Sequence, residues 1–136
     1  MTVRAILETA LYARDLAAAE AFYNRLLDRE PYARAEGRHV FYKLDNQMLL
    51  IFNPEATRKP STGKLSVPAH GAIGEGHVCF AASASDLDAW RDRLAELAIA
   101  IEADIEWPGE GRSIYIRDPA GNSVEFAEPR IWGFAP

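Results

Sequence analysis

Apolar and polar residues alternate along the first half of the chain in a pattern that predicts four strands and one helix. Residues two positions apart share a face of a strand, whereas apolar residues three or four positions apart form one face of a helix. The expected strands are 3–12, 32–36, 39–44 and 48–52. The expected helix runs from Leu16 to about Leu27, with Asp15 as its N-cap.

The same order of elements is expected again in the second half. The expected strands are 77–82, 99–107, 113–117 and 123–127. Ser85 and Asp88 form a capping-box-like pair, and the apolar residues after them have helical spacing. Asp118 to Asn122 has the composition of a tight turn, which makes 111–129 a hairpin.

The two hairpins also repeat in sequence, which indicates an internal duplication. GRHVFYK at 37–43 matches GRSIYIR at 111–117 with a separation of 74 residues, and the same separation pairs Ile51 with Glu125. We therefore expect an α+β fold of two β-α-β-β-β modules. One helix and four strands cannot cover both faces of a small sheet, so the modules should join through their sheets and enclose a central cup.

The 136 residues suffice for a single domain with a full core. We place module one at about 1–53, a connector at about 54–76, module two at about 77–130 and a C-terminal tail at 131–136. Pro and Gly punctuate the connector, and loops of this length are commonly functional lids or partly disordered. The apolar tail is expected either to contact a partner or to pack on its own subunit.

Alternation divides the strand residues into two faces. The more apolar set should lie under the helices. It comprises Leu7, Leu11, Leu50, Phe52, Val78, Phe80, Val124 and Phe126. The other set should face the cup, and it comprises Glu8, Ile51, His77 and Glu125, with His39, Phe41, Ser113 and Tyr115 added by the same parity.

Composition narrows the class of partner. A net charge of −5 without a cluster of Lys or Arg favours neither nucleic acid nor an anionic membrane surface, so a small molecule or another protein is expected. The N-terminus lacks an export signal, and a lone cysteine forms no internal disulfide, so we expect a cytoplasmic protein. That cysteine, Cys79, is expected to be a small core residue.

The predicted cup collects two carboxylates and an imidazole, which are costly to desolvate without a partner. A divalent metal ion would remove that cost, because Glu oxygens and a His nitrogen suit Mn, Fe, Zn, Ni or Co. Each of these side chains taken alone is more simply solvated or hydrogen-bonded. Glu8 and His77, however, begin the first strands of the two modules, and Glu125 lies on the last, so pseudo-twofold pairing would bring the three together.

Three segments resemble the vicinal oxygen chelate superfamily, which includes glyoxalase I, extradiol dioxygenases, and fosfomycin and bleomycin resistance proteins. They are ILETALYARDLAAAEAFYNRLL, GHVCFAASASDLDAW and IYIRDPAGNSVEFAEP, and the resemblance spans nearly the whole chain. It implies paired β-α-β-β-β modules that form an open barrel-like cup around a metal, and often a homodimer.

The resemblance also implies roles for individual residues. Glu8 falls where the family has its first ligand, usually His or Gln; His77 and Glu125 fall on the other two common ligand positions. Ile51 occupies the fourth position, which is Glu in glyoxalase-like members, and cannot bind metal. His70, in the connector, is an expected substitute ligand or substrate contact.

Two functions of different classes follow. The first is a metal-dependent enzyme, a lyase, isomerase or dioxygenase, whose ion chelates adjacent oxygens of a small substrate while Glu8 or Glu125 moves a proton. The second is a metal-free protein that sequesters an aromatic or cationic compound against Phe41 and Tyr115. A purely structural or dimerisation module is the weakest alternative, because it leaves the cup carboxylates without a role.

Overall fold

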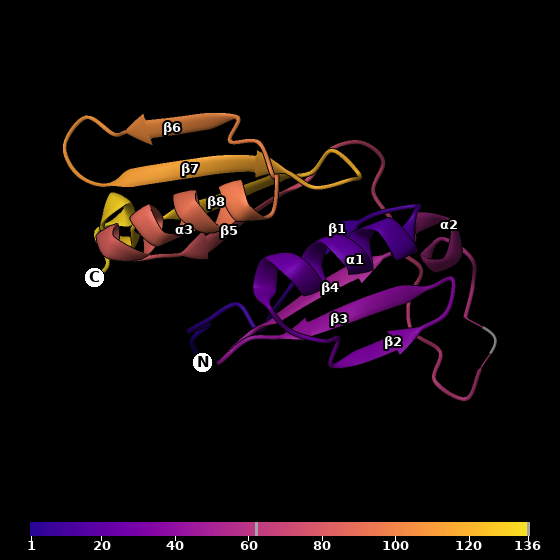
Figure 1. Cartoon of the computed structure of the whole chain (residues 1–136). Helices are drawn as coiled ribbons and strands as arrows, with labels where there is room; N and C mark the ends of the chain where they lie inside the picture. Colours follow the sequence, from indigo (N-terminus) through magenta and orange to yellow (C-terminus); the bar gives the residue numbers. More distant parts are fainter. Residues whose placement is uncertain (62, 136) are drawn as a thin grey trace. The chain divides into compact units, whose positions relative to one another are not determined.

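The computed structural model describes residues 1–61 and 63–135. Residue 62 of the expected connector and residue 136 of the expected tail lie outside the described residues. The chain forms two compact units, Met1–Gly74 and Glu75–Pro136, whose boundary falls within the expected connector (Figure 1). We describe each unit separately.

The first unit contains one long helix and a four-stranded sheet. Its strands are β1 (Glu8–Tyr12), β2 (Ala33–Ala35), β3 (His39–Lys43) and β4 (Met48–Phe52), with α1 (Leu16–Leu27) after β1 and the short helix α2 (Pro54–Thr57) after β4. The strand order is β1-β4-β3-β2. β1 runs parallel to β4, and the other neighbours are antiparallel.

The second unit repeats this topology. Its strands are β5 (His77–Ala81), β6 (Ala103–Glu106), β7 (Arg112–Arg117) and β8 (Ser123–Ala127), with α3 (Ala84–Glu96) after β5 and a 3-10 helix, η1 (Pro129–Trp132), at the end. The strand order is β5-β8-β7-β6, again with one parallel pair, β5 and β8. The expected α+β fold with duplicated β-α-β-β-β elements is confirmed.

The helix starts depend on side-chain caps. Asp15 accepts a hydrogen bond from the Ala18 amide at the start of α1, as expected. In α3 the expected pair was wrong by two positions: Ser83 is the N-cap, and it forms a capping box with Asp86. Ser85 and Asp88 have the same spacing, so the sequence offered two registers for one motif.

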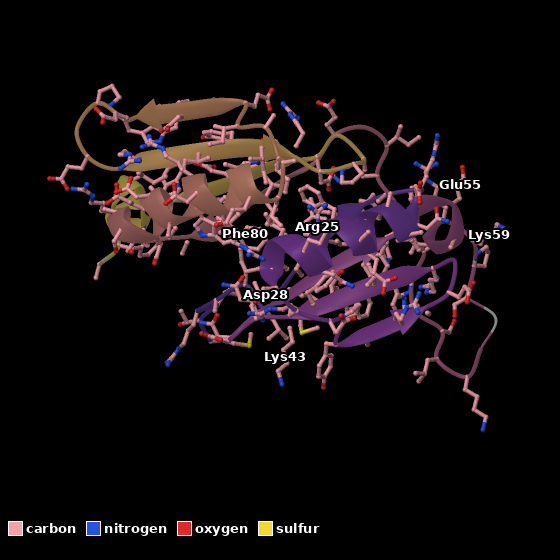
Figure 2. All side chains as sticks on the ribbon, viewed as in Figure 1. Arg25, Asp28, Lys43, Glu55, Lys59 and Phe80 are labelled. Atoms are coloured by element: carbon pink, nitrogen blue, oxygen red, sulfur yellow. The ribbon has the colours of Figure 1, made fainter. Side chains whose placement is uncertain are left out.

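Two expected strands are shorter in the structure by several residues, whereas the others differ by no more than one residue at either end. β1 begins at Glu8, and Leu7, expected to be buried, is 72% exposed. The expected strand 99–107 is reduced to Ala103–Glu106, because the chain leaves α3 through a turn in which Ala98 has a positive φ of 56° and the Ile99 amide bonds back to Leu94. The connector begins with α2, where Glu55 and the following Lys59 extend outwards (Figure 2).

In each unit the long helix covers one face of the sheet, which we call the helical face; the other is the opposite face (Figure 1). In the second unit Trp90 of α3 stacks on Phe126 with ring centroids 4.1 Å apart. In the first unit the Tyr42 hydroxyl donates to the Asn24 side chain and to the Glu20 carbonyl of α1. Together with the strand pairing, these contacts show which side chains of each strand lie on the helical face.

The side chains of β4 lie on the faces of the sheet opposite to those expected. Tyr42 pairs with Leu49 and Val40 with Ile51, so Ile51 lies on the helical face, where it is fully buried. Leu50 and Phe52 therefore lie on the opposite face with Glu8. The prediction failed because β4 is buried along its length, so apolar character does not distinguish its two faces.

A difference in length between the two repeated hairpins explains this wrong prediction. Val40 pairs with Ile51 and Ile114 with Phe126, so β4 and β8 correspond with a separation of 75 residues, whereas β3 and β7 keep 74. The second hairpin has one more residue in its turn. The structural counterpart of Glu125 is therefore Leu50, which pairs with Phe41 as Glu125 pairs with Tyr115.

The core of each unit lies between helix and sheet. The fully buried side chains include Tyr23, Leu26 and Tyr42 in the first unit and Leu87, Ile114 and Phe126 in the second. Among the described residues, no helix combines the length and apolar character needed to span a bilayer.

Candidate functional site

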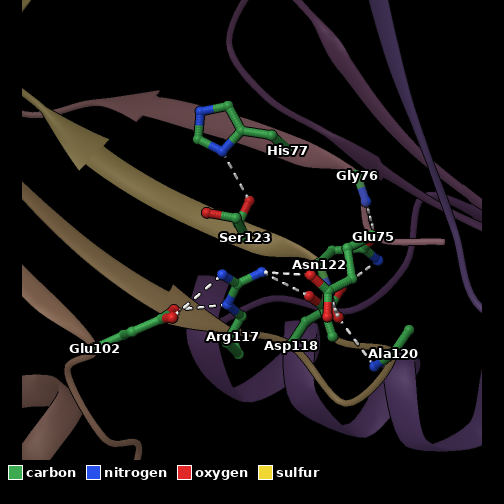
Figure 3. A network of polar contacts seen from close by, with 10 residues as sticks. Glu75, Gly76, His77, Glu102, Arg117, Asp118, Ala120, Asn122 and Ser123 are labelled. Atoms are coloured by element: carbon green, nitrogen blue, oxygen red, sulfur yellow. Dashed lines mark hydrogen bonds and ion pairs between the residues drawn. The ribbon is translucent and has the colours of Figure 1, made fainter.

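His77 opens β5, and one of its ring nitrogens is fixed by the backbone. Its Nδ1 lies 3.1 Å from the Ser123 carbonyl oxygen (Figure 3). A carbonyl oxygen only accepts hydrogen bonds, so Nδ1 carries the hydrogen. In the neutral ring, Nε2 is then an acceptor with its lone pair directed away from the backbone.

Glu125 faces that lone pair. Its Oε2 lies 3.2 Å from His77 Nε2, and the residue is only 6% exposed, in the middle of β8. Two atoms that both carry lone pairs do not approach this closely without a positive charge between them. Either a proton lies between the two atoms and is shared by the imidazole and the carboxylate, or a cation binds both atoms.

The neighbours of Glu125 across the sheet are Cys79 on β5 and Tyr115 on β7. Burial, followed by a hydrogen bond to Glu125, raises the pKa of Tyr115 to about 12. Its hydroxyl therefore stays protonated at neutral pH.

Cys79 is exposed, so the expectation of a core cysteine was wrong. The residue lies on the opposite face, where a core position would require the helical face. Local desolvation of the thiol, followed by the charge of Glu125, raises the pKa of Cys79 to about 12. The thiol is therefore protonated at neutral pH.

The turn between β7 and β8 fixes the start of β5. Asp118 Oδ1 accepts from the amides of Ala120 and Asn122, and its Oδ2 accepts from the Asn122 side chain (Figure 3). Asn122 Oδ1 in turn accepts from the Gly76 amide at 2.7 Å. The sequence indicated a turn here, but not that its side chains hold the residue preceding His77.

A pocket of about 790 Å³ adjoins the His77–Glu125 pair. Its wall includes His77, Glu125 and Tyr115, together with Trp107, Arg130 and Trp132. Sequence reasoning placed the first three in the cup. It missed Arg130, because the 3-10 helix that carries this side chain has no periodic signal in the sequence.

The first unit brings together other predicted residues. His39 stacks on Phe41 with ring centroids 4.0 Å apart, and both rings contact Phe52 edge to face. His70 packs against Phe52 at 4.7 Å, and its Nδ1 lies 2.7 Å from the Tyr12 hydroxyl. Three of the expected substrate contacts thus lie in one aromatic cluster on the opposite face.

His39 places a polar ring nitrogen in the interior of this cluster, where burial is costly. Its Nδ1 is buried and forms no hydrogen bond with the residues that the structure describes. Burial, followed by the charge of Arg38, lowers the pKa of His39, so the ring is neutral near pH 7. A neutral His39 ring stacked on Phe41 makes this cluster better suited to an apolar ligand group than to an ion.

Glu8 begins β1 at the place that His77 occupies in β5, and it is exposed. Within either unit, the described residues include no group of three or more His, Cys, Asp or Glu side chains with a metal-binding arrangement. The second unit thus supplies two candidate ligands, His77 and Glu125, and Glu8 belongs to the first.

The His77–Glu125 pair fits a metal ion in its donor chemistry. Metal-binding histidines commonly donate the second ring nitrogen to a backbone carbonyl, as His77 does to Ser123. Nitrogen and oxygen donors bind Zn and similar ions at about 2.0–2.2 Å, and two such donors on one ion lie about 3 Å apart. The separation of Nε2 and Oε2 agrees with this.

Comparison with known proteins identifies the family. The model of the glyoxalase/bleomycin resistance protein/dioxygenase superfamily matches residues 5–126. A comparison with curated protein sequences gave no match. A crystal structure named as lactoylglutathione lyase from Agrobacterium tumefaciens is 45% identical, covers 98% of this chain and 100% of its own, and has a TM-score of 0.91.

More distant structures share the fold. A glyoxalase/bleomycin resistance protein/dioxygenase from Nocardioides is 23% identical, with a TM-score of 0.73 over 94% of this chain and 85% of its own. A glyoxalase/bleomycin resistance protein from Catenulispora acidiphila is 22% identical, with a TM-score of 0.66 over 90% and 96%. The chain belongs to the glyoxalase/bleomycin resistance protein/dioxygenase superfamily.

Proposed function

We propose that this chain is a metal-dependent enzyme that binds a small molecule through two adjacent oxygens, with Glu8, His77 and Glu125 as metal ligands. The observation that carries the proposal is the 3.2 Å contact between His77 Nε2 and Glu125 Oε2, in which the ring tautomer leaves both atoms with lone pairs. Fe, Mn, Zn, Ni and Co are all compatible with this donor set.

A bound divalent ion would polarise the substrate oxygens and stabilise negative charge that develops on them. The protein residues have separate tasks. Glu125 would move a proton when it is displaced from the ion, because it is buried beside the pocket and adjoins a protonated phenol. Tyr115 holds the Glu125 carboxylate in place. His39, Phe41 and His70 contact the substrate in this proposal, and Glu8 is the alternative proton carrier.

Lyase chemistry is the reaction class with the most support. The Agrobacterium protein with 45% identity is named as a lactoylglutathione lyase. Leu50 stands at the counterpart of Glu125, so a carboxylate is not available there as a fourth ligand. We therefore propose a three-ligand centre. We also propose that the chain forms a homodimer, as its resemblance to the superfamily implies.

Metal content tests the proposal. Protein purified without chelators should contain about one metal ion per active site, measured by inductively coupled plasma mass spectrometry, or should take up Fe, Mn, Zn, Ni or Co on reconstitution. His77→Ala and Glu125→Ala should each lose this metal. Glu96→Gln is the matched control, because Glu96 is exposed at the end of α3 and should leave metal content unchanged. Wild-type protein that neither contains nor takes up metal would sink the proposal.

The second candidate is a metal-free binding protein. A protonated His77 would satisfy Glu125 without any metal, and Trp107 and Tyr115 on the same pocket would bind a cation or an aromatic ring. Ligand binding that survives EDTA supports this candidate, whereas binding that disappears with the metal supports the enzyme.

A further inference from the structure

The pocket in the second unit is larger than a chelating group alone requires. At about 790 Å³ it lies in the range of pockets that hold ligands of drug size, whereas two adjacent oxygens and their carbons occupy a small part of it. The His77–Glu125 pair lines the same pocket as Trp107 and Trp132. A substrate bound at the pair therefore has room to extend towards the two indole rings.

Trp107 is oriented by the sheet. Its Nε1 donates to the Ser113 hydroxyl at 2.8 Å, and Ser113 is fully buried. Because the polar edge of the ring is already bonded, the part of Trp107 that remains exposed is its apolar surface, with the residue 39% exposed. An apolar, planar group is the best complement to such a surface.

The wall next to Trp107 is tightly built. Gly111, with φ of +94°, lies so close to η1 that a Cβ at this position would come within 2.5 Å of the Ile131 side chain. The Arg112 amide donates to Glu128 just before η1, and the Trp107 amide bonds to the Gly111 carbonyl. These contacts hold the turn that carries Trp107 against the segment that carries Trp132.

The charges on the wall do not favour an anionic substituent. Arg130 is the cationic side chain among the residues lining this pocket, and it donates to both oxygens of Glu128 at 2.9 and 3.3 Å. Glu110 lies 3.8 Å from the same guanidinium and also lines the pocket. The charge of Arg130 is thus balanced by Glu128, and Glu110 repels a carboxylate.

From this pocket we infer that the substrate carries an uncharged aromatic ring, which stacks on Trp107 while the adjacent oxygens lie at the His77–Glu125 pair. The inference rests on the proposed function for the position of the oxygens, and on Trp107, Trp132 and the neutralised Arg130 for the ring. Trp132, which is 79% exposed, lines the same pocket as a second aromatic surface.

The test uses two neutral probes that share adjacent oxygens and differ in one substituent: 2-hydroxyacetophenone, with a phenyl ring, and hydroxyacetone, with a methyl group. Isothermal titration calorimetry on metal-loaded protein should show the phenyl probe binding at least about tenfold more tightly. Trp107→Leu should reduce that preference to about threefold or less, and Trp107→Phe, which keeps a ring, should retain most of it. A carboxylate on the phenyl ring should weaken binding.

Phe134→Leu is the control, because Phe134 is exposed to 69% and does not line the pocket. Equal affinity for the two probes, or a preference that persists unchanged in Trp107→Leu, would overturn the inference. The same titrations on metal-free protein separate the two proposals. If the protein holds no metal but still prefers the phenyl probe through Trp107, the aromatic site stands and the proposed enzyme fails.

Discussion

The two units share one topology but differ on the opposite faces of their sheets. The helical faces are equally apolar: Val40 and Ile114 occupy the same place in β3 and β7, and both are buried. On the opposite faces, Phe41 corresponds to Tyr115 and Leu50 to Glu125. The first unit therefore has an aromatic and aliphatic surface where the second has hydrogen-bonding groups.

This difference shows how a duplicated fold separates stability from chemistry. Substitutions on the helical face change packing, which both units need. Substitutions on the opposite face change the chemistry without changing the strand order. Glu8 and His77 form a pair that is polar in both units, and they stand at the start of the corresponding edge strands β1 and β5.

The largest expected effect concerns that pair. If Glu8 is a metal ligand, Glu8→Leu should lower metal affinity by at least about tenfold, because the ion loses one of three protein donors. Glu8→His places the residue of the second unit in the first and should retain the metal. Competition with a chromophoric chelator measures both affinities.

If Glu8→Leu left the metal affinity unchanged, Glu8 would not be a metal ligand. All metal chemistry would then belong to the second unit. Leu50→Met is a useful control in the same sheet, because it preserves volume at a buried position and should leave metal affinity as it is.

An intermediate effect is expected at the turns. In both units the backbone joins the last strand to the residue before the first strand, through Met48 N to Leu7 O and through Ser123 N to Gly76 O, each at 2.9 Å. The second unit adds the Asn122 side chain, which is 1% exposed and bonds to both Asp118 and Gly76. The second turn is therefore part of the support for His77.

Asn122→Ala leaves the buried Asp118 carboxylate and the Gly76 amide without these bonds, so the free energy of unfolding should fall by about 1–3 kcal/mol. Metal affinity should fall as well, because His77 follows Gly76 directly. Chemical denaturation and chelator competition measure the two effects. Asn46→Ala, in the exposed turn of the first unit, should change stability by no more than about 0.5 kcal/mol. Equal losses in the two variants would contradict a special role for the second turn.

The sequence predicted the elements well, because strands and helices follow local patterns. The bounds of α1, β4 and β8 agree with the expectation to the residue. Glu125 was also assigned correctly to the face away from the helix, since the polar residue between Val124 and Phe126 has only one favourable side.

What the sequence missed depends on non-local contacts. The second hairpin turn is one residue longer than the first, but the sequence does not reveal this because β4 is apolar on both faces. The sequence therefore predicts Ile51, and not Leu50, as the counterpart of Glu125. The bonds from Asn122 to Gly76 and from Trp107 to Ser113 join segments through their three-dimensional arrangement. Such contacts leave no periodic signal in a single sequence.

The smallest expected effect is a difference between the two units in how a buried tyrosine makes the free energy of unfolding depend on pH. Tyr115 on the opposite face of the second unit has its pKa raised to about 12, first by burial and then by its hydrogen bond to Glu125. An unfolded tyrosine titrates near about 10, so between about pH 10 and 12 the unfolded chain loses this proton while the folded chain keeps it. The free energy of unfolding therefore falls as the pH rises through this window.

Tyr115→Phe removes that contribution, so its stability should fall less steeply between about pH 10 and 12 than that of the wild type, as measured by urea denaturation at each pH. Tyr42→Phe is the comparison in the first unit, where burial and then Glu20 also raise the tyrosine pKa. Tyr42 additionally donates to Asn24 at 2.6 Å, so Tyr42→Phe should cost about 1–3 kcal/mol already at neutral pH. An unchanged pH slope in Tyr115→Phe would mean that Tyr115 does not hold the Glu125 carboxylate, and positioning of that group would then rest on its other neighbours, His77 and Cys79.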